Sequence, residues 1–79
     1  MSYILLYFAS LADQAACSTE VRESQARTPR ELYSEVAAAH GFTMAPERLR
    51  VAVNGAFVDW EHGLSDRDEV VFLPPVSGG

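Results

Sequence analysis

The segment TPRELYSEVAAAHG constrains the fold most, because it carries the start and stop signals of a single helix. Thr28 can cap the first turn, Pro29 suits the first helical position, and Glu31 can complete a capping box by accepting from the N–H of the cap. Gly41 stands where a left-handed residue commonly closes a helix. The pattern predicts a helix over residues 29–40.

This helix is expected to be amphipathic. Leu32, Val36 and Ala39 recur at helical spacing and form one apolar face. The segments on both sides of the helix have the composition of strands, so they can supply a sheet against which this face packs.

Two strands are expected before the helix. Residues 3–8 form a run of aromatic and aliphatic side chains that favour β-structure. Residues 19–22 alternate polar and apolar side chains, as a half-exposed strand does. Residues 11–17, between these strands, can form a short helical turn.

Three strands are expected after the helix. In LRVAVNGAFVDW, Asn54 and Gly55 stand between alternating apolar residues, which is the strongest short-range signal for a hairpin with a type I′ turn. Trp60 is expected at the rim of this hairpin. Residues 69–73 form the last strand, and Pro74 ends it because proline cannot donate a hydrogen bond to a neighbouring strand.

This order of elements predicts an α+β fold of the β-grasp, or ubiquitin-like, type. We expect a mixed sheet of four to five strands with one main helix packed on one face, and with the first and last strands paired in parallel at its centre. Residues 1–74 are predicted to form this β-grasp domain, and residues 75–79 an extended C-terminal tail that ends in Gly-Gly.

Both central strands are apolar on both faces, although one helix can cover only one face of a sheet. The alternation places Tyr3, Leu5 and Phe72 on the helix side. Five apolar residues remain for the opposite side: Ile4, Leu6, Phe8, Val71 and Leu73. A sizeable exposed apolar patch commonly marks a partner site. The alternative is that loops such as residues 41–47 fold over this face.

The composition limits the kinds of partner and compartment. The net charge of −5 and the pI near 4.7 argue against a nucleic-acid or anionic-membrane surface, because such surfaces require clustered Lys and Arg. Cys17 is the one cysteine, so it cannot form an internal disulfide, and a reducing cytoplasm is expected. The apolar start SYILLYFASLA lacks a basic region and is too short to span a bilayer.

The sequence predicts no catalytic constellation of its own and no metal site. His40 and His62 stand far apart with no cysteine pair, and His40 suits the C-terminal end of a helix. Cys17 stands beside alanines and is expected to be a packing residue rather than a sulfur relay. Asp66 and Asp68 are expected in a solvated turn that can help to attract a basic partner.

The segment FLPPVSGG combines a stiff spacer with a tip that has no side chains. The prolines are expected to hold the base of the tail extended. Gly78 and Gly79 lack a Cβ atom, so they can enter a narrow channel and adopt unusual backbone angles there. Four residues at the end of the domain and in the tail are predicted to contact a partner: Pro74, Pro75, Val76 and Ser77.

Several motifs together resemble the MoaD-type sulfur carrier, the small subunit of molybdopterin synthase. They are YFASLAD near the start, the capped helix, the VAVNG hairpin, the D-x-D-E-V turn and the closing LPPVSGG. The resemblance covers essentially the whole chain. It implies that the carboxylate of Gly79 is adenylated with ATP by an E1-like activating enzyme and receives sulfur from a donor as a thiocarboxylate.

The resemblance also implies how that sulfur is used. The thiocarboxylate, with Gly78 and Gly79 at the reacting end, donates sulfur to cyclic pyranopterin monophosphate on the large subunit in molybdenum cofactor biosynthesis. The chain is then a cytoplasmic co-substrate subunit without a tightly bound cofactor, in a 2:2 assembly with the large subunit.

The chain departs from the MoaD-type pattern at two positions. Arg67 stands in SDRDEV where the family often has glycine, and Ala12 stands where an arginine is common. If Arg67 is left-handed, it costs roughly 1 kcal/mol relative to glycine. Ala12 removes one polar contact with a partner.

Three other functions are compatible with the sequence. A carrier of this fold can deliver sulfur to the thiamine, cysteine or tRNA-thiolation pathway, although the PPVSGG ending favours molybdopterin. A ubiquitin-like modifier would instead be conjugated to lysines of target proteins through the same adenylate. A plain interaction module would have an inert terminus.

Overall fold

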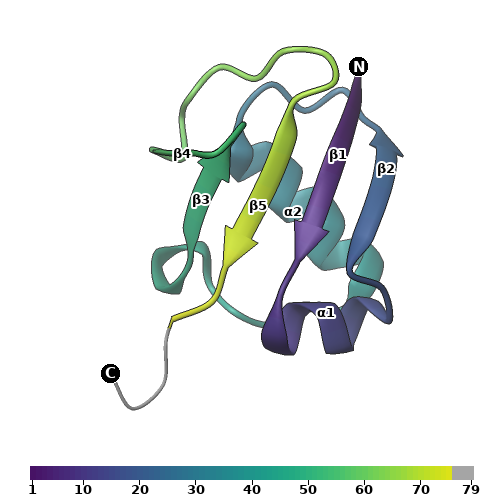
Figure 1. The fold of residues 1–79 in the computed structure, drawn as a ribbon. Coiled ribbons are helices and arrows are strands. Elements are labelled where there is room, and N and C mark those ends of the chain that lie inside the picture. Colours follow the sequence, from purple (N-terminus) through teal and green to yellow (C-terminus); the bar gives the residue numbers. More distant parts are fainter. Residues whose placement is uncertain (76–79) are drawn as a thin grey trace.

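The computed structural model describes residues 1–75 (Figure 1). Val76, Ser77, Gly78 and Gly79 lie outside the described residues, so the predictions made for them stay predictions. The elements follow in the order β1 (Ser2–Tyr7), α1 (Ala9–Ala15), β2 (Thr19–Glu23), α2 (Pro29–His40), the 3₁₀ turn η1 (Pro46–Arg48), β3 (Arg50–Val53), β4 (Ala56–Val58) and β5 (Glu69–Leu73).

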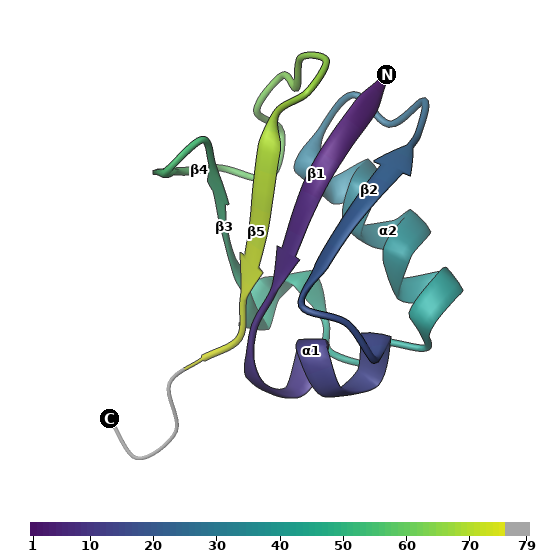
Figure 2. The same cartoon turned by 45° about the vertical axis from the view of Figure 1, so that its right-hand side comes forward.

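The five strands form one mixed sheet in the order β2-β1-β5-β3-β4. β1 and β5 are parallel neighbours at its centre, with Leu5 opposite Val70 and Tyr7 opposite Phe72, and the other pairs are antiparallel. Helix α2 crosses one face of the sheet, and α1 lies beyond the end of β1 (Figures 1 and 2). This topology agrees with the predicted β-grasp arrangement. The short helix α1 begins at Ala9, two residues earlier than expected.

The core fills the space between α2 and the sheet. Tyr3, Leu5 and Phe72 are fully buried from the sheet side. Burying a large apolar side chain stabilises a fold by roughly 1.5–3 kcal/mol, so these residues and their helical partners supply most of the driving force. Trp60 is not confined to the predicted position at the rim of the hairpin. Its ring also stacks on the core residue Phe72, with ring centroids 5.8 Å apart.

Helix α2 begins and ends where the sequence predicts, with two differences in detail. Thr28 Oγ1 accepts from the N–H of Glu31 at 3.2 Å, and Gly41 closes the helix with φ +76°. The Glu31 carboxylate accepts from the N–H of Arg27 at 2.7 Å, so the predicted bond to the N–H of the cap is wrong. The carboxylate instead satisfies a donor one residue further from the helix.

The second difference concerns the buried face of α2. Leu32 and Val36 are buried as predicted, but Ala39 is exposed and Tyr33 is buried in its place. The stripe continues from Val36 to His40, one residue beyond Ala39, because i and i+4 also share a helix face. The ring of His40 packs edge-on against Tyr7, with ring centroids 5.6 Å apart.

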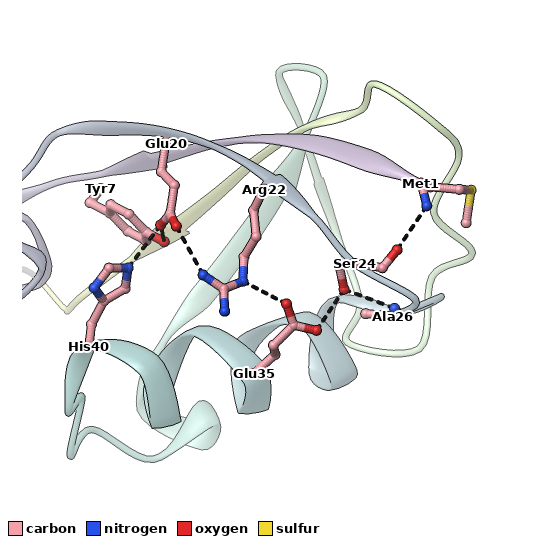
Figure 3. A network of polar contacts seen from close by, with 8 residues as sticks. All are labelled: Met1, Tyr7, Glu20, Arg22, Ser24, Ala26, Glu35 and His40. Carbon is pink, nitrogen blue, oxygen red and sulfur yellow. Dashed lines mark hydrogen bonds and ion pairs between the residues drawn. The ribbon is translucent and has the colours of Figure 1, made fainter.

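A polar network connects the β2 side of the sheet to α2 (Figure 3). Glu20 is its first junction: Tyr7 Oη donates to Glu20 Oε1 at 2.7 Å, His40 Nε2 lies 2.8 Å from the same oxygen, and Arg22 Nη1 donates to Glu20 Oε2 at 3.0 Å. Burial alone would raise the pKa of Glu20, but these three contacts outweigh it and hold the pKa below its ordinary value. Burial and the Glu20 contact raise the pKa of Tyr7 far above its usual range.

Arg22 extends the network to the middle of α2. Its Nε donates to Glu35 Oε2 at 2.6 Å, and Ser24 Oγ donates to Glu35 Oε1 at 2.7 Å. The hydrogen bond from Arg22 holds the pKa of Glu35 below its ordinary value, and burial opposes it only in part. The network therefore attaches an edge strand to the helix that covers the core.

The lowered pKa of Glu35 predicts a dependence of stability on pH. Its contribution is fully present above the unfolded-state pKa near 4.3 and is lost as the pH falls through the lower, folded-state value. Glu35→Gln should therefore reduce the free energy of unfolding by about 1 kcal/mol at pH 7, and the difference from wild type should disappear at low pH. Urea unfolding across this pH range measures both. Glu61→Gln is the control, because its partner Arg30 is on an exposed surface, and a loss as large as that of Glu35→Gln would contradict the prediction.

The acidic turn before β5 is a structural clamp rather than only a solvated loop. Asp66 Oδ1 accepts from the N–H of Ser2 at 2.7 Å. Asp68 Oδ1 accepts from Asn54 Nδ2 at 2.9 Å, and Asn54 Oδ1 accepts from the N–H of Glu69 at 3.0 Å. Positive φ angles at Asn54 and the glycine after it agree with the predicted type I′ turn. This clamp holds the β3–β4 hairpin against the start of β5.

Arg67 in this turn has φ +68°, so it adopts the left-handed conformation on which the predicted cost depends. The Cβ atom of Arg67 crowds the backbone in this conformation, which costs free energy, and glycine avoids that cost. Part of the resulting gain in stability is lost because glycine has more conformational freedom in the unfolded state. Arg67→Gly should raise the free energy of unfolding by up to about 1 kcal/mol, seen as a rise of a few degrees in Tm. Arg67→Ala removes the same charge but keeps Cβ, and an equal rise for both variants would contradict the backbone explanation.

Candidate functional site

The point at which β5 leads into the tail is well defined. Leu73 is the last strand residue, and Pro74 and Pro75 follow outside the strand, as the sequence predicts. Because β1 and β5 run in parallel, both strands end at the same end of the sheet. Phe8 therefore lies at the end of the sheet from which the tail starts, and half of its side-chain surface is exposed (50%).

The face of the sheet opposite α2, which we call the open face, is not covered by any helix of residues 1–75 (Figures 1 and 2). The predicted residues Ile4, Leu6, Val71 and Leu73 all alternate onto it and are half-buried. Leu6 pairs with Val71 in the register of β1 and β5, so the apolar side chains are contiguous across the sheet centre. The structure thus brings the predicted apolar patch together beside the start of the tail.

The alternative that residues 41–47 fold over the open face is wrong. Phe42 is buried on the helix side, where its ring contacts Tyr7 and Tyr33. Tyr33 Oη donates to the carbonyl oxygen of Met44 at 2.6 Å, which holds the loop to α2. The loop is thus held on the helix side by the burial of Phe42 between α2 and the sheet, and it leaves the open face uncovered.

The structure adds three residues to the open face that the sequence analysis did not single out. Val21 of β2 is 71% exposed and Phe57 of β4 is 59% exposed, so the apolar surface extends to both edges of the sheet. The guanidinium carbon of Arg50 lies 4.3 Å from the ring centroid of Phe57. The alternation of polar and apolar residues within 19–22 and after Asn54-Gly55 could have predicted the exposure of Val21 and Phe57. The position of Arg50 could not be predicted in this way, because it depends on the pairing of β3 with β5.

The remaining candidates for chemistry are placed away from the open face. Cys17 is a half-buried free cysteine that packs against the core, in agreement with the predicted packing role. His40 belongs to the polar network, and His62 is exposed in the turn after β4. Among residues 1–75, no group of three or more His, Cys, Asp and Glu side chains could hold a metal ion. In the same part of the chain no helix has the length and apolar character needed to cross a membrane.

Comparisons with known proteins show which proteins the chain is similar to. A family model described as the ThiS family matches residues 5–79. A segment of 32 residues is 53% identical to the molybdopterin synthase sulfur carrier subunit of Escherichia coli (strain K12). That alignment spans 40% of this chain and 40% of the relative, which is less than half of either protein.

Solved structures show the same fold over the whole chain. SAMP1 from Haloferax volcanii is 23% identical with a TM-score of 0.81, and the match covers 100% of both chains. A chain in the protein–protein complex of subunits 1 and 2 of the molybdopterin-converting factor from Helicobacter pylori 26695 is 22% identical with a TM-score of 0.70, again over 100% of both chains. At these identities the likeness shows the fold, and it confirms the ubiquitin-like β-grasp prediction.

Proposed function

This chain belongs to the ThiS family, and from that membership we propose that it is the sulfur-carrier subunit of a molybdopterin synthase. The observation that carries the proposal is the 53% identity, over 32 residues, to a molybdopterin synthase sulfur carrier subunit. This match favours the molybdopterin pathway over the thiamine, cysteine and tRNA-thiolation pathways. The family match also extends through residue 79, so it includes the Gly-Gly tail.

The chemistry that we propose takes place on the carboxylate of Gly79. On an E1-like activating enzyme, a carboxylate oxygen attacks ATP, pyrophosphate leaves and an acyl-adenylate forms. Sulfur at the oxidation level of hydrosulfide, supplied by a donor, then attacks the acyl carbon; the C–S bond forms, AMP is released, and the product is a thiocarboxylate. A thiocarboxylate is more acidic than a cysteine thiol, whose pKa is about 8.5, so it is ionised at neutral pH and acts as a soft nucleophile.

The body of the domain would dock and the tail would reach the reaction centre. The open face lies beside the start of the tail, so a partner that covers this face also receives the tail. The five residues after Pro74 span at most about 17 Å when fully extended, which is enough to enter an active site whose mouth lies at the docked face. We propose that the large synthase subunit is this partner and that cyclic pyranopterin monophosphate accepts the sulfur there.

The names of two similar proteins support the proposed assembly. The relative in E. coli is named a sulfur carrier subunit, and the H. pylori structure contains two subunits of one converting factor. The further partners that we propose are the activating enzyme, which uses ATP, and a sulfur donor. The single free cysteine agrees with the cytoplasm as the proposed location.

The sulfur-carrier proposal is tested at the tip of the tail. Incubation of the purified protein with its activating enzyme, ATP and a sulfur donor should increase its intact mass by sulfur minus oxygen, with the change located at Gly79 by fragmentation. Deletion of Gly79 should abolish sulfur transfer to the pterin precursor and leave Tm unchanged, because the core ends before the tail.

The same mass measurement separates the other functions. Amide-linked conjugates with lysines of other proteins would identify a modifier, and an unchanged mass would identify an interaction module. Normal pterin sulfuration by the protein that lacks Gly79 would refute the mechanism.

The docking surface is tested by a charge placed at its centre. Val71→Arg should weaken binding to the large subunit by roughly 100-fold or more, because an unpaired charge buried in an apolar interface costs several kcal/mol. Isothermal titration calorimetry measures the change, and a thermal melt checks the fold. Ala38→Arg introduces the same charge on the exposed side of α2, and equal affinities for the two variants would contradict docking through the open face.

A further inference from the structure

The charged residues of the open face are separated along its length. Strand alternation and register place Glu23 and Glu69 on this face at the end where β5 begins. Arg50 lies at the other end, opposite Leu73, where β5 leads into the tail. Among the strand residues of this face within residues 1–75, the side chains between these two ends are uncharged. The face is therefore apolar in the middle, acidic at one end and basic at the end with the tail.

Arg50 is held on the open face by its neighbour in the hairpin. The Phe57 ring lies 4.3 Å from the guanidinium carbon, which is within the range of a cation–π contact. None of the ion pairs formed within residues 1–75 involves Arg50. Phe57 thus keeps the guanidinium of Arg50 close to the sheet, and the N–H donors of Arg50 remain available to a partner.

A partner that covers this face must compensate the cation. Burial of a guanidinium without an opposite charge is costly, and a carboxylate can accept two of its parallel N–H donors. An acidic side chain of the partner is therefore needed at the end next to the tail. At the other end, Glu69 favours a basic side chain, whereas Glu23 already lies 4.0 Å from the N-terminal amine of Met1. The net charge of −5 by itself would favour a basic partner over the whole surface. The basic end is the exception, so a partner can bind the face in only one of its two end-to-end orientations without bringing like charges together.

We infer that Arg50, positioned by Phe57, sets the orientation of the docked large subunit by pairing with an Asp or Glu beside the entrance for the tail. This inference rests on the proposed function, since it takes the open face as the docking surface. A partner turned end to end would bring like charges together at both ends of the face. Arg50 is thus a specificity and positioning residue that aims the tail at the entrance of the partner's site.

The absence of lysine from the sequence allows a direct test of this contact. All six basic residues are arginines, so Arg50→Lys introduces one lysine side chain at a known place. A carbodiimide couples a lysine amine to a carboxylate in direct contact, forming an amide while the reagent takes up the water as a urea. In a mixture with the large synthase subunit of the same organism, mass spectrometry should find position 50 joined to an Asp or Glu of that subunit. The matched control Arg30→Lys, on α2, should give no such link.

Affinity gives a second, independent readout. Arg50→Glu should weaken binding to the large subunit by at least about 10-fold at low salt, and the loss should shrink as salt is added. Arg30→Glu makes the same change in net charge away from the open face and should change the affinity less than about twofold. Thermal melts of both variants check that the fold is retained, which is expected because both side chains are exposed.

The outcomes separate this inference from the function on which it rests. Equal affinities of Arg50→Glu and Arg30→Glu, or no link from position 50 to the large subunit, would overturn the inference while a loss of binding by Val71→Arg still supports the docking face. A link from position 50 only to a second copy of this chain would also overturn it. Unchanged binding by Val71→Arg would remove the docking face itself, whatever the result at position 50.

Discussion

The parallel pairing of β1 with β5 is the constraint on which the rest of the structure depends. It joins the first strand to the last, places both at the centre of the sheet and makes both end at the same end of the domain. Both strands are apolar on both faces, so burial alone does not determine which face points toward α2. The hydroxyl groups of Tyr3 and Tyr7 supply this choice, because they reach the carbonyl oxygen of Ala26 and the carboxylate of Glu20 on the helix side.

The two faces of the sheet have separate roles because their interactions do not overlap. On the helix side, the core and the polar network through Glu20, Arg22 and Glu35 attach α2 to the sheet. On the open face, the apolar surface between Val21 and Phe57 contributes little to that attachment. A stable body can therefore present the open face to the partner that we propose. The polar network connects an edge strand with α2, so partner contacts on the other face leave it intact.

Local signals predicted the elements well, and non-local pairing explains what they missed. Helix α2, the Asn54-Gly55 turn and the end of β5 at Pro74 each depend on a few consecutive residues, and the structure agrees with them. The prediction that Ala39 lies in the core is wrong because the residue three positions after Val36 and the residue four positions after it share a helix face. Only packing against the sheet decides which of the two is buried. The place of Arg50 was not predicted for a related reason: it lies near the start of the tail only because β3 pairs with β5, which is not the next strand in the sequence.

The central position of β5 has a consequence for how the protein is made. Residues 69–73 are synthesised after all of the other helices and strands described, yet they fill the gap between β1 and β3. A nascent chain cannot close its sheet until these residues have left the ribosome, because β1 and β3 have no direct pairing. Translation that stops early therefore yields a polypeptide with an incomplete core, which proteases can remove. The core is thus completed only when the strand that immediately precedes the tail has been synthesised.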